Sequence, residues 1–178
     1  METREITGEV RIATNPDGGR TMTGYACRWD SLSQGLSYVE VFRHGAFNKT
    51  LQEADVVALA SHDKTKPLGR MSSGTLRLEE DNWGLAFECD LDPSISYVGD
   101  LVKNIERHDI IGCSFGFRPI KSNRCKDGTV ERLEVALAEI SPTAAPAYQE
   151  TSVAVRNKNG TTPKLSVAMA RLALWGCR

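Results

Sequence analysis

A serine between two glycines, with all three histidines before it in the chain, is the sequence feature that most restricts the possible folds. Residues 112–116 read Gly-Cys-Ser-Phe-Gly, which fits the G-x-S-x-G pattern of a serine nucleophile. The histidines are His44, His62 and His108. An α/β-hydrolase needs its histidine after the serine, in the order Ser, acid, His. The chain order therefore excludes that fold, and any base for Ser114 has to come from an earlier segment.

The rest of the chain reads as mainly β structure. Alternating apolar residues and turn signals predict strands at residues 5–13, 21–29, 38–42, 56–61, 74–80, 83–91, 114–120 and 130–140. Turn residues at 15–19, 81–82 and 124–128 predict that the strands on either side of each form a hairpin. Apolar residues at helical spacing predict a main helix over 94–107, capped by Ser94 or Ser96. Shorter helices are expected at 45–51 and 165–175. The pattern favours an α+β class with one domain over 1–155, followed by a linker and a C-terminal amphipathic helix or tail over 156–178.

Composition excludes several classes of function. The 178 residues carry a formal net charge of −1, which gives no general attraction to nucleic acid or to an anionic membrane. No apolar run approaches the roughly 18–20 residues that span a bilayer, and the N-terminus lacks the apolar core of a signal peptide. The five cysteines have neither C-x-x-C spacing nor a nearby histidine cluster, so we expect no metal and no cofactor.

His62 is the best candidate for the base that Ser114 needs. It closes the apolar run 56–61, and the end of a buried strand can hold an imidazole in a fixed direction. His44 and His108 lie among polar residues and are expected on the surface. Cys113 is a rival nucleophile, but neighbouring residues on a strand point to opposite faces, so Cys113 and Ser114 cannot easily share one base.

A third residue should orient the imidazole of the base. Glu139 ends the apolar run 135–138, and a carboxylate there must find a cationic or hydrogen-bonding partner if it is buried. Asp63 is the alternative, although a residue adjacent to His62 rarely reaches back to its ring. Asp63 fits better as a turn residue in 63–67, and Glu139 could also be a surface residue at a strand end.

With these residues in view, the chain resembles the prohead serine protease family of tailed bacteriophages. The resembling segments keep one order between about residue 24 and residue 155. They are 38–42 with 45–47, 57–63, 67–70, 74–78, 112–117, 139–142, 146–148 and 151–154. Each segment is short, but their number and common order make the resemblance specific.

The resemblance implies a β-barrel-like fold of the herpesvirus assembly protease type. It also implies a serine endopeptidase in which Ser114 is the nucleophile, His62 the base and Glu139 the orienting residue. The herpesvirus enzymes have a histidine in this third position, whereas the phage resemblance leads us to expect Glu139. Their paired arginines near the oxyanion site are also missing here, where residues 144–146 read Ala-Ala-Pro.

The implied substrates are the precursor of the major capsid protein, its scaffold segment and the protease itself, during virion maturation of a phage or prophage. The implied location is the host bacterial cytoplasm, inside the assembling prohead, and a homodimer or other self-association is expected. Two alternatives stay open: a catalytically inactive scaffold or assembly protein that retains the protease fold, and a hydrolase of small esters.

Overall fold

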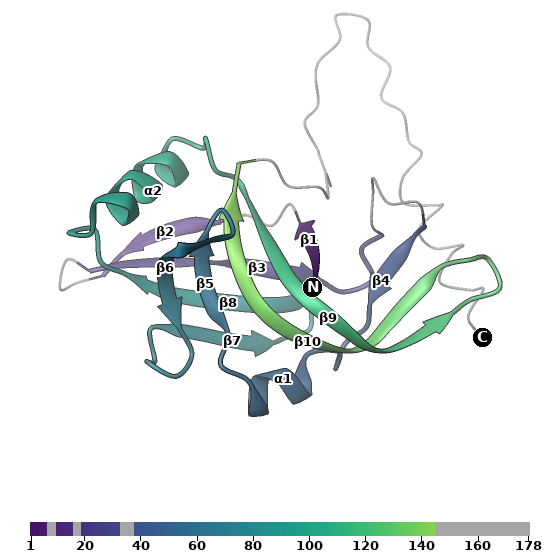
Figure 1. Cartoon of the computed structure of the whole chain (residues 1–178). Helices are drawn as coiled ribbons and strands as arrows, with labels where there is room; N and C mark the ends of the chain where they lie inside the picture. The colour runs from purple at the N-terminus through teal and green to yellow at the C-terminus, as the bar shows by residue number, and fades with distance from the viewer. Residues whose placement is uncertain (7–9, 16–18, 33–37, 145–178) are drawn as a thin grey trace, which may run out of the picture.

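Two β-sheets and two helices form the computed structural model, which describes residues 1–6, 10–15, 19–32 and 38–144 (Figure 1). Of these residues, most belong to strands, which confirms the predicted mainly β class. The strands are β1 (Glu2–Ile6), β2 (Arg11–Thr14), β3 (Arg20–Arg28), β4 (Glu40–Phe42), β5 (Val57–Ala60), β6 (Asp63–Arg70), β7 (Leu76–Glu80), β8 (Gly84–Leu91), β9 (Gly112–Arg124) and β10 (Val130–Thr143). The helices are α1 (Asn48–Glu53) and α2 (Ser96–Glu106).

The long strand β10 organises the larger sheet. It pairs antiparallel with β9 along most of its length, parallel with β4 near its start and parallel with β5 near its end. The order is β1-β9-β10-β5-β6, with β4 beside β10. Register shifts, including one between Leu137 and Glu139, interrupt the β9–β10 ladder. Such irregularities bend a strand, and Figure 1 shows both strands curving from the sheet into a projecting hairpin.

Neither sheet closes, so the expected barrel is not present among the described residues. The larger sheet ends at the edge strands β1 and β6, and the second sheet, in the order β2-β3-β8-β7, ends at β2 and β7. A barrel requires its first and last strands to pair, and here these edges do not pair with one another. The likeness to a herpesvirus protease stays a prediction.

Local sequence patterns predicted the hairpins and the main helix well. The β2–β3, β7–β8 and β9–β10 hairpins are confirmed, and α2 lies within the range expected for the main helix. Three details were wrong. The single strand expected over 5–13 is divided between β1 and β2, which belong to different sheets. The turn expected at 63–67 is part of strand β6. Helix α2 has Ile95 at its N-cap and no side-chain cap, so neither Ser94 nor Ser96 caps it.

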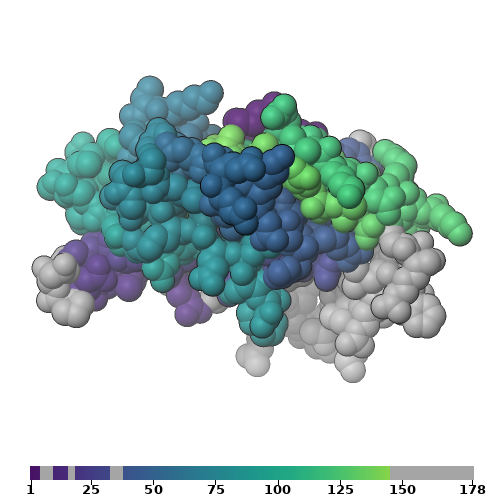
Figure 2. All heavy atoms as spheres, turned by 90° about the horizontal axis from the view of Figure 1, so that it is seen from below, coloured from purple at the N-terminus to yellow at the C-terminus, as the bar shows by residue number. Residues whose placement is uncertain are grey.

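The core lies on one face of β9 and β10. Four phenylalanine rings meet there with centroids 5.2–5.9 Å apart; they are Phe42, Phe47, Phe115 and Phe117. Helix α1 is tied to β10, because the Thr50 hydroxyl donates to the Val135 carbonyl (2.7 Å) and accepts from the Leu137 amide (3.1 Å). Seen from below, the blue region around α1 lies against the green strands (Figure 2). Strand alternation directs Ser114 away from this aromatic face.

The predictions for the C-terminal part concern residues outside the described ranges. The linker and helix expected over 156–178 fall there, and the domain boundary at 155 stays a prediction. In the part of the chain that is described, neither helix has the length and apolar character needed to cross a membrane.

Candidate active site

His62 lies in the tight turn that joins β5 to β6. Ala60 pairs with Asp63, so Ser61 and His62 are the two central residues of the hairpin, and both have positive φ angles (49° and 62°). Two-residue hairpins favour this left-handed backbone, but they usually use Asn or Gly for it. A non-glycine residue held in this region stores strain, which clusters at functional sites. The turn is tied to β10, since the Ser61 amide donates to the Pro142 carbonyl at 3.3 Å.

The imidazole of His62 is held by Glu139. Its Nδ1 lies 2.8 Å from Glu139 Oε1, and the carboxylate is buried while the imidazole is about one-third exposed. The parallel pairing of Glu139 with Val57 places the end of β10 next to β5 and so next to the turn. The other ring nitrogen, Nε2, is buried and has no hydrogen-bond partner in the described part of the molecule. Because buried polar atoms are nearly always bonded, an unpartnered Nε2 is a nitrogen available for proton transfer.

Two residues that the sequence did not single out complete the surroundings of Glu139. The Ser141 hydroxyl donates a hydrogen bond to Glu139 Oε2 (2.6 Å) and accepts one from the His62 amide (3.1 Å). Gly116 lies opposite Glu139 in the β9–β10 ladder. Both had a signal in the sequence: Ser141 follows Glu139 at the two-residue period of a strand face, and Gly116 is the last glycine of the motif.

Substitution of Gly116 by alanine is expected to displace the carboxylate of Glu139. A Cβ at this position would lie 2.6 Å from Glu139 Oε1, the atom that holds His62. The carboxylate can swing away, so we expect a small change in melting temperature but a fall in kcat of about 10- to 100-fold, since misplacement by about 1 Å can cost 100-fold. Steady-state kinetics and thermal melting of G116A would check this. Wild-type kcat in a folded G116A variant would contradict it.

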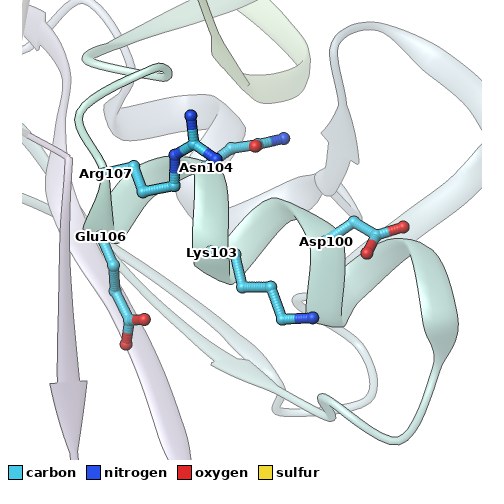
Figure 3. Close-up of a pocket in the computed structure, with 5 residues that line it drawn as sticks. All are labelled: Asp100, Lys103, Asn104, Glu106 and Arg107. Carbon is cyan, nitrogen blue, oxygen red and sulfur yellow. The ribbon is translucent and has the colours of Figure 1, made fainter.

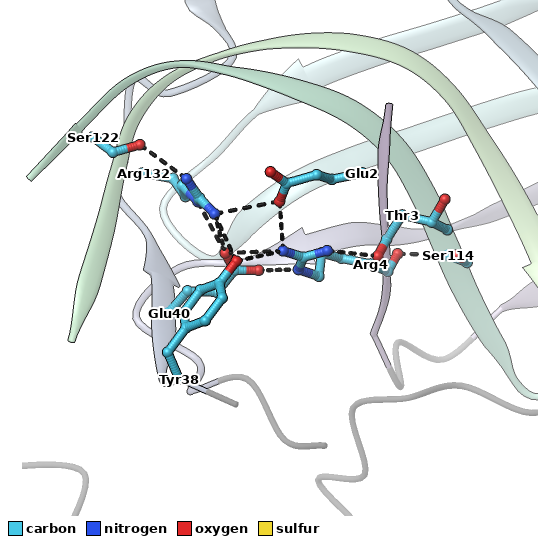
Figure 4. Close-up of polar contacts among 8 residues, drawn as sticks. All are labelled: Glu2, Thr3, Arg4, Tyr38, Glu40, Ser114, Ser122 and Arg132. Atoms are coloured by element: carbon cyan, nitrogen blue, oxygen red, sulfur yellow. Dashed lines mark hydrogen bonds and ion pairs between the residues drawn. The ribbon is translucent and has the colours of Figure 1, made fainter. Parts of the chain in front are cut away.

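Ser114 lies in the same region, but its hydroxyl points to a different partner. It is directly opposite Ser141 in the ladder, and opposed residues have Cβ atoms about 4.5–5.5 Å apart. Ser114 is fully buried, and its Oγ donates to the backbone carbonyl of Arg4 in β1 at 3.0 Å (Figure 4). Between the described side chains of Ser114 and His62 there is no hydrogen bond. In the structure, His62 is therefore hydrogen-bonded to Glu139 of β10. Ser114 lies on the neighbouring strand β9 and is hydrogen-bonded to β1 instead.

The other candidates lie outside this arrangement. His44 and His108 are exposed, as expected. Asp63 accepts hydrogen bonds from the amide and hydroxyl of Thr65 and does not bond His62. Cys113 is a buried thiol facing the core, and burial raises its pKa, which opposes formation of the reactive thiolate.

Two surface hollows lie along α2. One adjoins the His62 turn and is lined by residues of the turn, of β6 and of α2, among them Ser61, Asp63 and Tyr97. The other lies over the C-terminal part of α2 and is lined by side chains of both charges, including Lys103, Glu106 and Arg107 (Figure 3). The first lies beside the turn that carries His62, but neither hollow has His62, Glu139 or Ser114 in its lining.

The described residues contain no cluster of three or more histidine, cysteine or acidic side chains that could hold a metal ion. The side chains in contact at the site are the His62 imidazole, the Glu139 carboxylate and the Ser141 hydroxyl. Comparisons with curated proteins and with solved structures gave no match. A family model described as caudovirus prohead serine protease matches residues 7–165, and the chain belongs to this family.

Proposed function

We propose that the chain is a serine endopeptidase that cleaves capsid precursor and scaffold protein, and also itself, during phage head maturation. The observation that carries the proposal is the contact of 2.8 Å between His62 Nδ1 and Glu139 Oε1, with Nε2 left unpartnered. A carboxylate at Nδ1 fixes the tautomer in which Nε2 can accept a proton, which is the role of the acid in serine protease triads. Membership of the prohead protease family supports the same chemistry.

In the proposed reaction the Ser114 side chain changes its rotamer. Its hydroxyl then leaves the Arg4 carbonyl and donates a hydrogen bond to His62 Nε2 instead. Oγ then attacks the scissile carbonyl carbon as its proton passes to Nε2, and the protonated imidazole donates that proton to the leaving amine. A water molecule then gives a proton to His62 Nε2 and attacks the acyl carbon. The bond to Ser114 Oγ breaks, and His62 returns the proton to Ser114. Backbone N–H groups are the proposed donors to the oxyanion.

The substrates, the herpesvirus-type fold, the self-association and the location inside the assembling prohead belong to the same proposal.

One observation favours an inactive assembly protein as the second candidate. Ser114 is fully buried and its hydroxyl is engaged by Arg4, so the described state does not present the nucleophile to a substrate.

Mass spectrometry can separate these two functions. The purified chain is incubated with the capsid precursor of its own phage, with and without prior treatment with a fluorophosphonate probe. We expect defined fragments of the precursor, their loss after treatment, and a covalent adduct on the peptide that contains Ser114. An intact precursor and an unlabelled Ser114, in both the free protein and the assembled prohead, would support the inactive assembly protein instead.

A further inference from the structure

Ser141 contacts both members of the His62–Glu139 pair. Its single hydroxyl joins two parts of the candidate site, donating to Glu139 Oε2 at 2.6 Å and accepting from the His62 amide at 3.1 Å. It is fully buried and lies directly opposite Ser114 in the β9–β10 ladder. The Ser141 side chain therefore contacts Glu139 and the backbone of His62, and Ser141 lies directly across the β9–β10 ladder from Ser114.

The two hydrogen bonds hold two different groups in place, the Glu139 carboxylate and the His62 amide. The carboxylate of Glu139 has two oxygens, and without a donor on Oε2 it could rotate away from His62 Nδ1. The His62 amide lies in a turn with two left-handed residues, where a buried amide without a partner would add to the strain. Ser141 satisfies the carboxylate oxygen and the amide together.

We propose that Ser141 is a positioning residue of the active site, which fixes the Glu139 carboxylate relative to the His62 imidazole. The inference rests on the proposed serine protease function. Ser141 does not touch the reacting atoms; it acts through Glu139 and through the turn that carries His62. The peptide bond is attacked by Ser114, and the Ser141 hydroxyl keeps its proton throughout.

The test compares the rates at which three variants cleave the capsid precursor. Ser141→Ala removes the hydroxyl, and Ser141→Thr retains it. Thr50→Val is the matched control, because Thr50 also uses one buried hydroxyl to donate to and accept from β10 backbone groups, but it lies at Val135 and Leu137, away from His62. Melting temperatures are recorded for each, and kcat and KM are measured well below the lowest of them.

We expect Ser141→Ala to lower kcat by about 10- to 100-fold, the scale expected for a misplaced catalytic group, with KM unchanged because the buried hydroxyl cannot contact substrate. Ser141→Thr should recover most of kcat, and Thr50→Val should lose thermal stability without losing kcat. Wild-type kcat in Ser141→Ala, or an equal loss in Thr50→Val, would overturn the positioning role alone. No cleavage by the wild-type protein would instead overturn the proposed function.

Discussion

Replacement of Ser114 by alanine is expected to lower kcat for cleavage of the capsid precursor by about 10⁴- to 10⁶-fold. Nucleophile and base act as a unit in serine proteases, so removing either one forfeits nearly the whole contribution of the triad. His62→Ala should therefore show a loss of similar size. Glu139→Gln should lose less, because an amide can still contact the ring although it no longer fixes the correct tautomer. The measurement is the rate of fragment formation under single-turnover conditions.

Cys113→Ala is the control for this experiment. Cys113 is the adjacent residue on β9, is buried on the core face and has a free thiol, so its loss removes the rival nucleophile while leaving the His62–Glu139 pair in place. We expect it to retain activity. Ser114→Ala gives up one buried hydrogen bond to the Arg4 carbonyl, which is worth about 1 kcal/mol, and should stay folded. Undiminished cleavage by a folded Ser114→Ala variant would rule out the serine mechanism.

The parts of the fold set by local patterns were predictable from the sequence. Alternation and turn signals gave the β7–β8 and β9–β10 hairpins, and the apolar spacing of Val98, Leu101, Val102 and Ile105 gave the buried face of α2. These elements depend on residues close together in the chain. The period of the apolar residues therefore carries enough information to define them.

The parts set by distant pairing were not predictable. The segment 63–67 contains Lys, Thr and Pro and has no apolar alternation, yet it is a strand because β6 pairs with β5 as the edge of the larger sheet. Likewise, β1 is part of the larger sheet only through its pairing with β9, more than 100 residues later. Tertiary context decides such edge strands more than propensity does.

For the site, the sequence supplied residue types but not positions in space. Chain order and the apolar run before His62 led to the predicted base, and the strand end led to Glu139. The structure brings these two side chains into contact, and their catalytic roles stay predictions. The roles of Ser141 and Gly116 depend on the β9–β10 register, and the bond from Ser114 to Arg4 depends on β1 pairing with β9. A single sequence does not specify either register.

The strand that engages Ser114 is anchored by a buried ion cluster (Figure 4). Glu40 of β4 is fully buried between two guanidinium groups: Arg4 of β1 bonds one carboxylate oxygen through its Nε, and Arg132 of β10 bonds the other at 2.9 Å. Tyr38 and Glu2 add further contacts to both arginines. The cluster connects β1, β4 and β10, and Arg4 lies over the ring of Phe117, on the sheet face that strand alternation places opposite Ser114.

Glu40→Gln is expected to lower the free energy of unfolding by about 3–5 kcal/mol, a large part of the 5–15 kcal/mol typical of a domain. Gln keeps the volume of Glu40 but removes its charge, so the two guanidinium groups lose their fully buried carboxylate and retain the carboxylate of Glu2, whose side chain is 37% exposed. Glu88→Gln is the control, because Glu88 pairs with Arg77 at 3.1 Å on the surface with more than half of its side chain exposed, and such pairs contribute less than about 1 kcal/mol. Urea unfolding of both variants measures the difference.

The same variant also tests the link between β1 and the nucleophile. Loss of the Glu40 charge weakens the attachment of Arg4, and the Arg4 carbonyl is the group that accepts the hydrogen bond from the Ser114 hydroxyl. Hydrogen exchange of the β1 amides should therefore accelerate in Glu40→Gln below the unfolding transition, and the fluorophosphonate probe should label Ser114 faster than in wild type. A destabilised variant with unchanged β1 exchange and unchanged labelling would show that the cluster holds the sheet together without governing access to Ser114.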